Sequence, residues 1–191
     1  SRLAHHQFGT EPRWERLPAP GVELSDLDTS LILKTASLAG RRGRVFRDPQ
    51  EPMEILRQLS LASDGAILNS ALVLFGKNPQ SRYPQTRVRA AVYQTDKTGE
   101  FTDRRDFEGN LFLLLENMET FLKKHLAVSA TFPTERFQRK DIPEYPFPAL
   151  DEAILNALIH RDYADFVGSV SVEIYPAEIR IWNPGRLPLG L

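Results

Sequence analysis

The sequence predicts an α+β fold, with helices packed on mixed or antiparallel sheets. Several segments show the apolar period of a helix, others show short or alternating apolar runs, and their order along the chain is typical of this class. The 191 residues are 41% hydrophobic and 26% charged, with a net charge of -1. A globular chain of this length forms one large domain or two small ones.

The first part of the chain is predicted to contain two helices. Residues 1–24 are predicted to form a short element followed by an extended segment. A helix is expected over residues 26–38, ended by Gly40. A second helix is expected to begin at Pro52, since proline suits a first helical turn, and to run to about residue 61.

Strands and one long helix are expected next. The continuous apolar run 71–75 is typical of a buried strand. Residues 86–93 alternate between apolar and polar side chains, as in a half-buried strand. Residues 110–126 show the clearest helical pattern, and residues 128–137 are expected to hold one or two strands.

The proline-rich segment 142–148 is a stiff connector and marks the expected domain boundary. It separates a central α+β domain, residues 1–141, from a C-terminal module, residues 142–191. Within the module we expect a helix over residues 149–162 and then a pair of strands. The strands cover residues 169–175 and 178–182.

Composition excludes several classes of protein. The chain has no cysteine, which rules out disulfides and thiolate metal sites. It contains no Walker-type phosphate loop and no Gly-x-Ser-x-Gly motif. No apolar run is long enough to cross a membrane and no signal peptide is recognisable, so we expect a cytoplasmic protein with no membrane partner.

Both ends of the chain indicate a piece of a longer protein. The sequence begins without a methionine and ends directly after a turn motif. We therefore expect the function of the parent protein to be only partly present.

The helix 149–162 carries the main chemical signal. Glu152, Asn156 and His160 share one helix face at spacings of four residues. An asparagine oxygen can bind Mg²⁺ together with phosphate oxygens and water, and Glu152 can polarise an attacking water. Spacing alone favours a merely solvated polar face. The Asn-Pro-Gly turn at residues 183–185 can form the base of a pocket for a nucleotide base. With this turn included, a nucleotide site and a solvated face are equally favoured.

Basic residues have two interpretations as well. His160 and Arg161 end the helix, where they can contact a phosphate or simply complement the helix dipole, and the second interpretation is slightly favoured. A second basic group contains residues suited to the backbone of a nucleic acid. These are Lys77, Arg82, Arg87 and Arg89. The acidic residues over 96–106 favour a solvated face for this group.

Five segments together resemble a known family. They cover residues 71–79, 107–112, 142–146, 152–163 and 179–188. In this order they resemble the prokaryotic predicted transcriptional regulators labelled RecG-like helicase C-terminal or divergent AAA proteins. The most specific motif is His-Arg-Asp-Tyr at residues 160–163, directly after Asn-Ala-Leu-Ile. No helicase motor motif occurs in the chain.

The resemblance implies roles for individual residues. In that family a Schlafen-type AlbA-like DNA-binding domain usually comes first, and the C-terminal part resembles the GHKL (Bergerat) ATPase fold of gyrase and histidine kinases. The resemblance implies that Glu152 is the catalytic general base and that Asn156 binds both the nucleotide and its Mg²⁺. The nucleotide-binding residues would further include His160, Arg161, Asn183 and Gly185. Asn183 stands where the family has an aspartate, and it lacks the charge of that residue.

The expectation is a fragment of a DNA-binding transcriptional regulator that contains the first half of a GHKL-like ATP-binding module. Mg-ATP would be the cofactor of the intact protein, which is a possible ATPase, and no cofactor or catalysis is expected in the fragment. DNA would bind through the missing N-terminal domain. The alternative is a degenerate nucleotide fold that serves as a structural or dimerisation module, with a homodimer as its partner state. The substitution at Asn183 and the end of the chain before the family's lid motivate this alternative.

Overall fold

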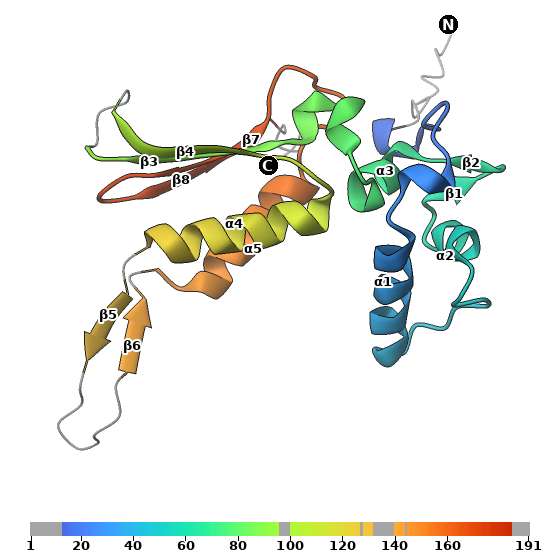
Figure 1. Ribbon diagram of the computed structural model, residues 1–191, viewed down its shortest axis with the longest axis horizontal. Coiled ribbons are helices and arrows are strands. Elements are labelled where there is room, and N and C mark those ends of the chain that lie inside the picture. Colours follow the sequence, from blue (N-terminus) through green and yellow to red (C-terminus); the bar gives the residue numbers. More distant parts are fainter. Residues whose placement is uncertain (1–12, 96–99, 127, 132–139, 144, 185–191) are drawn as a thin grey trace, which may run out of the picture. The chain divides into compact units, whose positions relative to one another are not determined.

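The structure is a computed structural model that describes residues 13–95, 100–126, 128–131, 140–143 and 145–184 (Figure 1). It has an α+β fold, as the sequence predicted. The chain divides into two compact units, Ser1–Gly76 and Lys77–Leu191. Within the described residues, no helix has the length and apolar character needed to cross a membrane.

The first unit contains three helices and a small hairpin. The helices are α1 (Thr29–Arg41), α2 (Pro52–Gln58) and α3 (Asn69–Phe75), and the antiparallel hairpin joins β1 (Ala62–Ser63) to β2 (Ala66–Ile67). Two short 3-10 helices precede them, η1 (Trp14–Arg16) and η2 (Leu24–Asp26). The Asp28 side chain begins α1 by accepting a hydrogen bond from the Leu31 amide at 3.0 Å, as an N-cap aspartate does.

Two predictions in this unit were wrong. The apolar run 71–75 lies in the helix α3 and not in a strand, because a run buried on every side has no period that separates the two structures. Gly76 ends this helix by donating its amide to the Leu72 carbonyl at 2.8 Å, and a Cβ at Gly76 would collide with that oxygen. Gly40 lies inside α1, which continues to Arg41.

The second unit is built around a four-stranded mixed sheet in the order β4-β3-β7-β8. Its strands are β3 (Val88–Tyr93), β4 (Phe101–Phe107), β7 (Val170–Ile174) and β8 (Ile179–Trp182). The pair β3–β7 is parallel, and the pairs β3–β4 and β7–β8 are antiparallel. Two short 3-10 helices, η3 (Pro79–Ser81) and η4 (Pro84–Thr86), lead into β3.

Two helices, α4 (Leu111–His125) and α5 (Phe147–Ile159), belong to the same unit. A separate antiparallel hairpin of β5 (Val128–Thr131) and β6 (Lys140–Pro143) lies between them in the sequence. Only part of the segment 128–137, for which strands were predicted, lies within the described residues. Strand β4 was not predicted, because its residues are mostly charged or exposed and show no apolar period.

Both helices lie on one side of the sheet (Figure 1). Val88 and Ala90 of β3 and Val170 and Val172 of β7 are at most 1% exposed, so alternate strand residues form the buried face. Helix α4 contacts β3, and α5 contacts β8. The apolar side chains of the helices complete this core. They are Leu114, Met118 and Leu122 of α4 and Leu150, Ile154 and Leu158 of α5.

Polar contacts fasten the end of α4 to the edge strand β4. The Asp103 carboxylate lies 3.0 Å from both Lys124 Nζ and His125 Nε2. The hydrogen bond from Lys124 holds the pKa of Asp103 below its ordinary value, with Arg105 and His125 contributing in the same direction. Phe107 of β4 packs edge-on against Phe121 of α4, with ring centroids 5.7 Å apart.

The predicted boundary at the connector 142–148 does not coincide with the division into compact units. Strands β3 and β7 come from opposite sides of that connector and pair residue by residue in one sheet. Contacts therefore cross residues 141 and 142, and the division falls at Gly76.

Shortening a buried side chain of α4 should lower the stability of the fold. Leu122→Ala removes a side chain that is fully buried, and we expect the free energy of unfolding to fall by about 2–5 kcal/mol. Leu113→Ala on the same helix is the matched control, since Leu113 is 42% exposed. Urea unfolding followed by circular dichroism measures both variants. Equal losses in the two would contradict the one-sided burial of α4.

Candidate functional site

Helix α5 presents a polar face opposite to its apolar one. Glu152 and Asn156 are both exposed, and the amide Nδ2 of Asn156 donates a hydrogen bond to Glu152 Oε1 at 3.0 Å. This bond places the nitrogen of the amide next to the carboxylate, which leaves the amide oxygen as the arm that accepts hydrogen bonds or binds a cation. The structure therefore brings together the two residues that the sequence singled out.

The donor set fits a magnesium ion that arrives with a polyphosphate. Such an ion takes one or two protein oxygens and completes its shell with phosphate oxygens and water. The amide oxygen of Asn156 is a hard oxygen donor of this kind, and the neighbouring Glu152 carboxylate can accept a proton from water. In the part of the chain that the structure describes, no group of three or more His, Cys, Asp or Glu residues could hold a metal by itself.

His160 and Arg161 follow α5 but have different surroundings. His160 is exposed at the C-cap, where its backbone amide donates to the Asn156 carbonyl at 2.9 Å. Arg161 is only 5% exposed. Its guanidinium donates to the backbone carbonyls of Asp162, at 3.2 Å, of Asp165, at 2.9 Å, and of Gly168.

Arg161 thus organises the loop that follows α5, residues 162–168. Burial lowers the pKa of its guanidinium, which stays charged because arginine does not lose its proton in proteins. The guanidinium donates its hydrogen bonds to three backbone carbonyl oxygens and not to a carboxylate. Its Nε is buried and has no hydrogen-bond partner among the described residues. A planar fork of five donors suits this arrangement, and a lysine could not reproduce it.

Tyr163 fixes the start of the same loop. Its hydroxyl donates to the Leu158 carbonyl at 2.8 Å, and the Arg161 guanidinium carbon lies 5.2 Å from the centre of its ring. Burial raises the pKa of Tyr163 to about 12. The Tyr163 carbonyl accepts a hydrogen bond from Gln85 Nε2 at 3.2 Å, which joins the loop to the segment before β3.

The end of this loop lies against the Asn-Pro turn that follows β8. A Cβ on Gly168 would lie 2.7 Å from Pro184 Cβ and 3.2 Å from the Trp182 ring. Glycine is therefore needed here for close approach. Asn183 is partly buried, and Gly185 lies outside the described residues. The His-Arg-Asp-Tyr loop and the turn at residues 183–184, which were separate motifs in the sequence, form one structural feature.

The four basic residues proposed for nucleic acid do not form one group. Lys77 and Arg82 are exposed, and Arg82 Nε donates to the Tyr83 hydroxyl at 3.3 Å. Arg87 and Arg89 both approach Asp106, at 3.8 and 4.0 Å. Of these residues, Arg89 alone lines the hollow described next.

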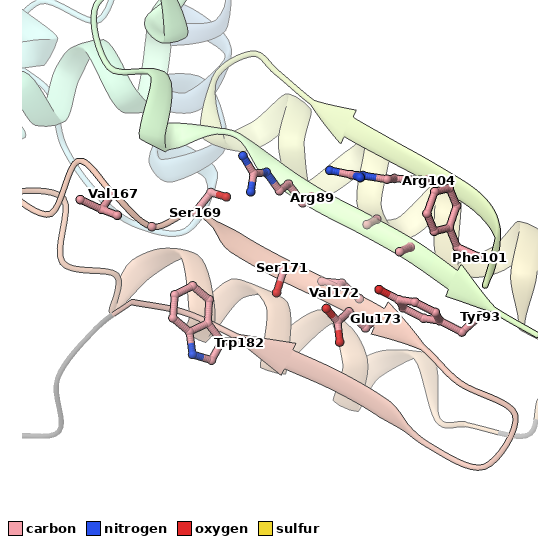
Figure 2. A pocket seen from close by; sticks show the side chains of 13 residues that line it. Arg89, Tyr93, Phe101, Arg104, Val167, Ser169, Ser171, Val172, Glu173 and Trp182 are labelled. Carbon is pink, nitrogen blue, oxygen red and sulfur yellow. The ribbon is translucent and has the colours of Figure 1, made fainter. Parts of the chain in front are cut away.

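A hollow of about 500 Å³ lies on the sheet face away from the helices (Figure 2). Figure 2 shows side chains from all four strands around it, with the helices behind the sheet. Its polar and aromatic lining consists of Arg89, Tyr93, Phe101, Arg104, Ser169, Ser171, Glu173 and Trp182. Most of these residues were not recognised in the sequence. The alternation in residues 86–93 and 169–175 is the signal that would have found those on β3 and β7. Those on β4 have no such signal, because that strand shows no apolar period.

Comparison with known proteins supports the fold. No protein-family model matches the chain, and no curated protein matches it. The crystal structure of the DIP2311 protein from Corynebacterium diphtheriae is similar, with a TM-score of 0.69 and 18% sequence identity. The match covers 96% of this chain and 35% of that one, so the chain spans about a third of its length. At this identity the similarity shows a shared fold alone, and the regulator family stays a prediction.

Gly168→Ala should separate the loop from the turn. The new methyl group would overlap the rigid Pro184 ring, and we expect the free energy of unfolding to fall by about 1–3 kcal/mol. The control is Gly40→Ala, since a Cβ there meets no atom within 4 Å and alanine favours a helix. Urea unfolding measures both. A Gly168→Ala chain as stable as the wild type would contradict this packing.

The raised pKa of Tyr163 predicts a loss of stability in alkali. The unfolded chain ionises tyrosine near pH 10, whereas the folded chain holds this proton until about pH 12. The stabilisation is therefore complete below about pH 10 and is lost as the pH rises towards 12. Tyr163→Phe removes this dependence, so the stability difference between wild type and variant should shrink over that interval. An alkaline decline that is the same in the wild type and in Tyr163→Phe would contradict the burial of this hydroxyl.

Proposed function

We propose that this chain supplies the first half of a GHKL-like Mg-ATP-binding module in a DNA-binding transcriptional regulator. The observation that carries the proposal is the hydrogen bond between Asn156 and Glu152 on the exposed face of α5. A bond of this kind holds an asparagine oxygen and a carboxylate side by side, one as a cation ligand and one as a base. Pairs at this spacing also occur on solvated helices, so the hydrogen bond supports the proposal together with the motif that contains both residues.

Each residue has a distinct role in this proposal. Asn156 would bind the magnesium ion through its amide oxygen, and the ion when bound would neutralise the charge of the phosphates. Glu152 would orient a water molecule and take its proton. The hydrogen bond from Asn156 places the Glu152 carboxylate beside the residue that would bind the ion, which is where the base would act.

The loop after α5 supports the same proposal indirectly. Arg161 is buried in its own loop, so its role would be to position residues 162–168 against the turn at residues 183–184. Phosphate contact falls more readily to His160, which is exposed at the end of the helix. Asn183 would meet the adenine edge with an amide, which both donates and accepts hydrogen bonds.

The role of the parent protein rests on the sequence resemblance. As a regulator it would contact DNA through a separate domain and act in the cytoplasm, with ATP binding or hydrolysis changing its state. A homodimer would be the state of the alternative, the structural or dimerisation module. None of these properties requires catalysis by the present chain alone.

Mg-ATP binding is tested by thermal unfolding of the intact parent protein and of its Asn156→Ala variant, with the present chain measured beside them. A ligand at a hundred times its dissociation constant adds about 2.7 kcal/mol of stability, enough to raise the midpoint by several degrees. We expect this shift for the wild-type parent protein with Mg-ATP, a smaller shift with ATP and a chelator, and none for its Asn156→Ala variant. The present chain alone, which supplies only half of the module, should show no shift.

Asp151→Ala is the matched control, because Asp151 is an exposed carboxylate on the same helix and makes no hydrogen bond to Asn156. It should keep the full shift. Equal shifts in Asn156→Ala and the wild type would refute the assignment of the ion. No shift in the wild type at millimolar Mg-ATP would favour the structural or dimerisation module instead.

A further inference from the structure

The sheet face away from α4 and α5, here called the open face, carries side chains in regular rows. The register places Asp106, Arg89, Ser171 and Trp182 in one row across the four strands. The next row on the same face contains Arg104, Ala91, Glu173 and Arg180. Phe101 pairs with Tyr93 at the far end. The face therefore carries three arginines, two carboxylates and aromatic rings at both of its edges.

We propose that the open face binds a single strand of nucleic acid. The proposal does not depend on ATP binding, because the residues that carry it lie on the sheet face opposite to α5. Its basis is the combination of exposed aromatic rings, which can stack on bases, with arginines that can meet phosphates.

The aromatic rings are exposed at both edges of the sheet. Trp182 on β8 is 54% exposed and Phe101 on β4 is 51% exposed, whereas large aromatic side chains are usually mostly buried. Tyr93 lies between them and stacks face to face on Tyr175, with ring centroids 4.5 Å apart. The two edge strands are three strand spacings apart, each about 4.8 Å. The four-stranded sheets of RNA-binding domains have the same number of strands, and they stack two or three bases on one face.

The charge of the lining complements a phosphate chain. Arg89 and Arg104 line the hollow against a single carboxylate, that of Glu173, so the lining is positive in a chain whose net charge is -1. Arg104 is held over the Phe101 ring, with its guanidinium carbon 5.9 Å from the ring centre. Arg89 approaches Asp106 only at 4.0 Å with both side chains exposed, a pair that contributes little and can open.

The two carboxylates in these rows, Glu173 and Asp106, are both engaged within the protein. Glu173 accepts a hydrogen bond from the Tyr175 hydroxyl at 3.1 Å. Asp106 faces both Arg87 and Arg89. A carboxylate among stacking positions can also accept hydrogen bonds from base amino groups. A duplex would not fit this chemistry, since its bases are stacked on one another and cannot reach the rings.

The probe is a fluorescein-labelled oligothymidylate of about 12 nucleotides, within the site sizes of such surfaces. Trp182 serves as the internal reporter in a Trp14→Phe background, because the chain contains two tryptophans. At low salt we expect probe anisotropy to rise and Trp182 emission to be quenched. A duplex of the same length should bind more weakly.

Four variants separate stacking from general charge. Phe101→Ala should weaken binding about tenfold through the lost stacking. Arg104→Ala should weaken it and reduce the slope of log affinity against log salt by about 0.7. Phe112→Ala and Lys123→Ala on α4 are the controls, since they remove an exposed aromatic and an exposed cation away from the open face. Both controls should leave affinity and slope unchanged.

Several outcomes would overturn the proposal. They are the absence of binding at low salt, equal affinity for the duplex, or equal losses in the α4 controls. If oligothymidylate does not bind and Trp182 emission changes with protein concentration, the open face is a contact between copies of this chain.

Discussion

The burial of one face of the β4-β3-β7-β8 sheet against α4 and α5 is the constraint on which the second unit depends. Because side chains alternate along a strand, fixing Val88, Val170 and Val172 in the core sends their neighbours to the opposite face. Arginines and a glutamate can occupy those neighbouring positions without being buried. The same constraint turns the polar face of α5 away from the sheet. The exposure of Glu152 and Asn156 on α5 and the exposure of the open face thus both follow from this packing of helices on the sheet.

Buried polar side chains then fix the connections between elements. Gln80 is 7% exposed, and its amide both donates to the Gly109 carbonyl at 2.9 Å and accepts from the Gly109 amide at 2.8 Å. This side chain therefore substitutes for a backbone partner where β4 turns into α4. Arg161 does the same for the loop after α5. Each replaces the water that a loop backbone would otherwise require, so neither can be removed without leaving buried groups unsatisfied.

Much of the fold could be predicted from local patterns. The helical period of residues 110–126 and 149–162 corresponds to α4 and α5, and the alternation before Tyr93 corresponds to β3. Strand β4 and helix α3 could not be found in this way, because one has no apolar period and the other is apolar throughout. The parallel pairing of β3 with β7 joins residues about eighty positions apart, and no local pattern specifies it.

The candidate site was predictable to a similar degree. Helical spacing placed Glu152 and Asn156 together, and the structure adds the hydrogen bond between them. The burial of Arg161 carried no signal, because arginine is rarely inside and only the loop geometry provides its acceptors. The open face depends on strand register, which the sequence does not define until the strands are paired.

The parallel pairing of β3 with β7 has a consequence for synthesis on the ribosome. The ribosome synthesises β3, β4 and α4 well before β7. During this interval the edge of β3 that pairs with β7 in the folded protein has no partner. The apolar side chains of β3 and α4 meet at once, but the half of the core that α5 and β7 supply is missing during this interval. A nascent chain in this state presents an unpaired edge and apolar surface, which are the features that chaperones bind and that promote aggregation. The yield of folded protein should therefore respond more to the speed of translation after residue 126 than before it.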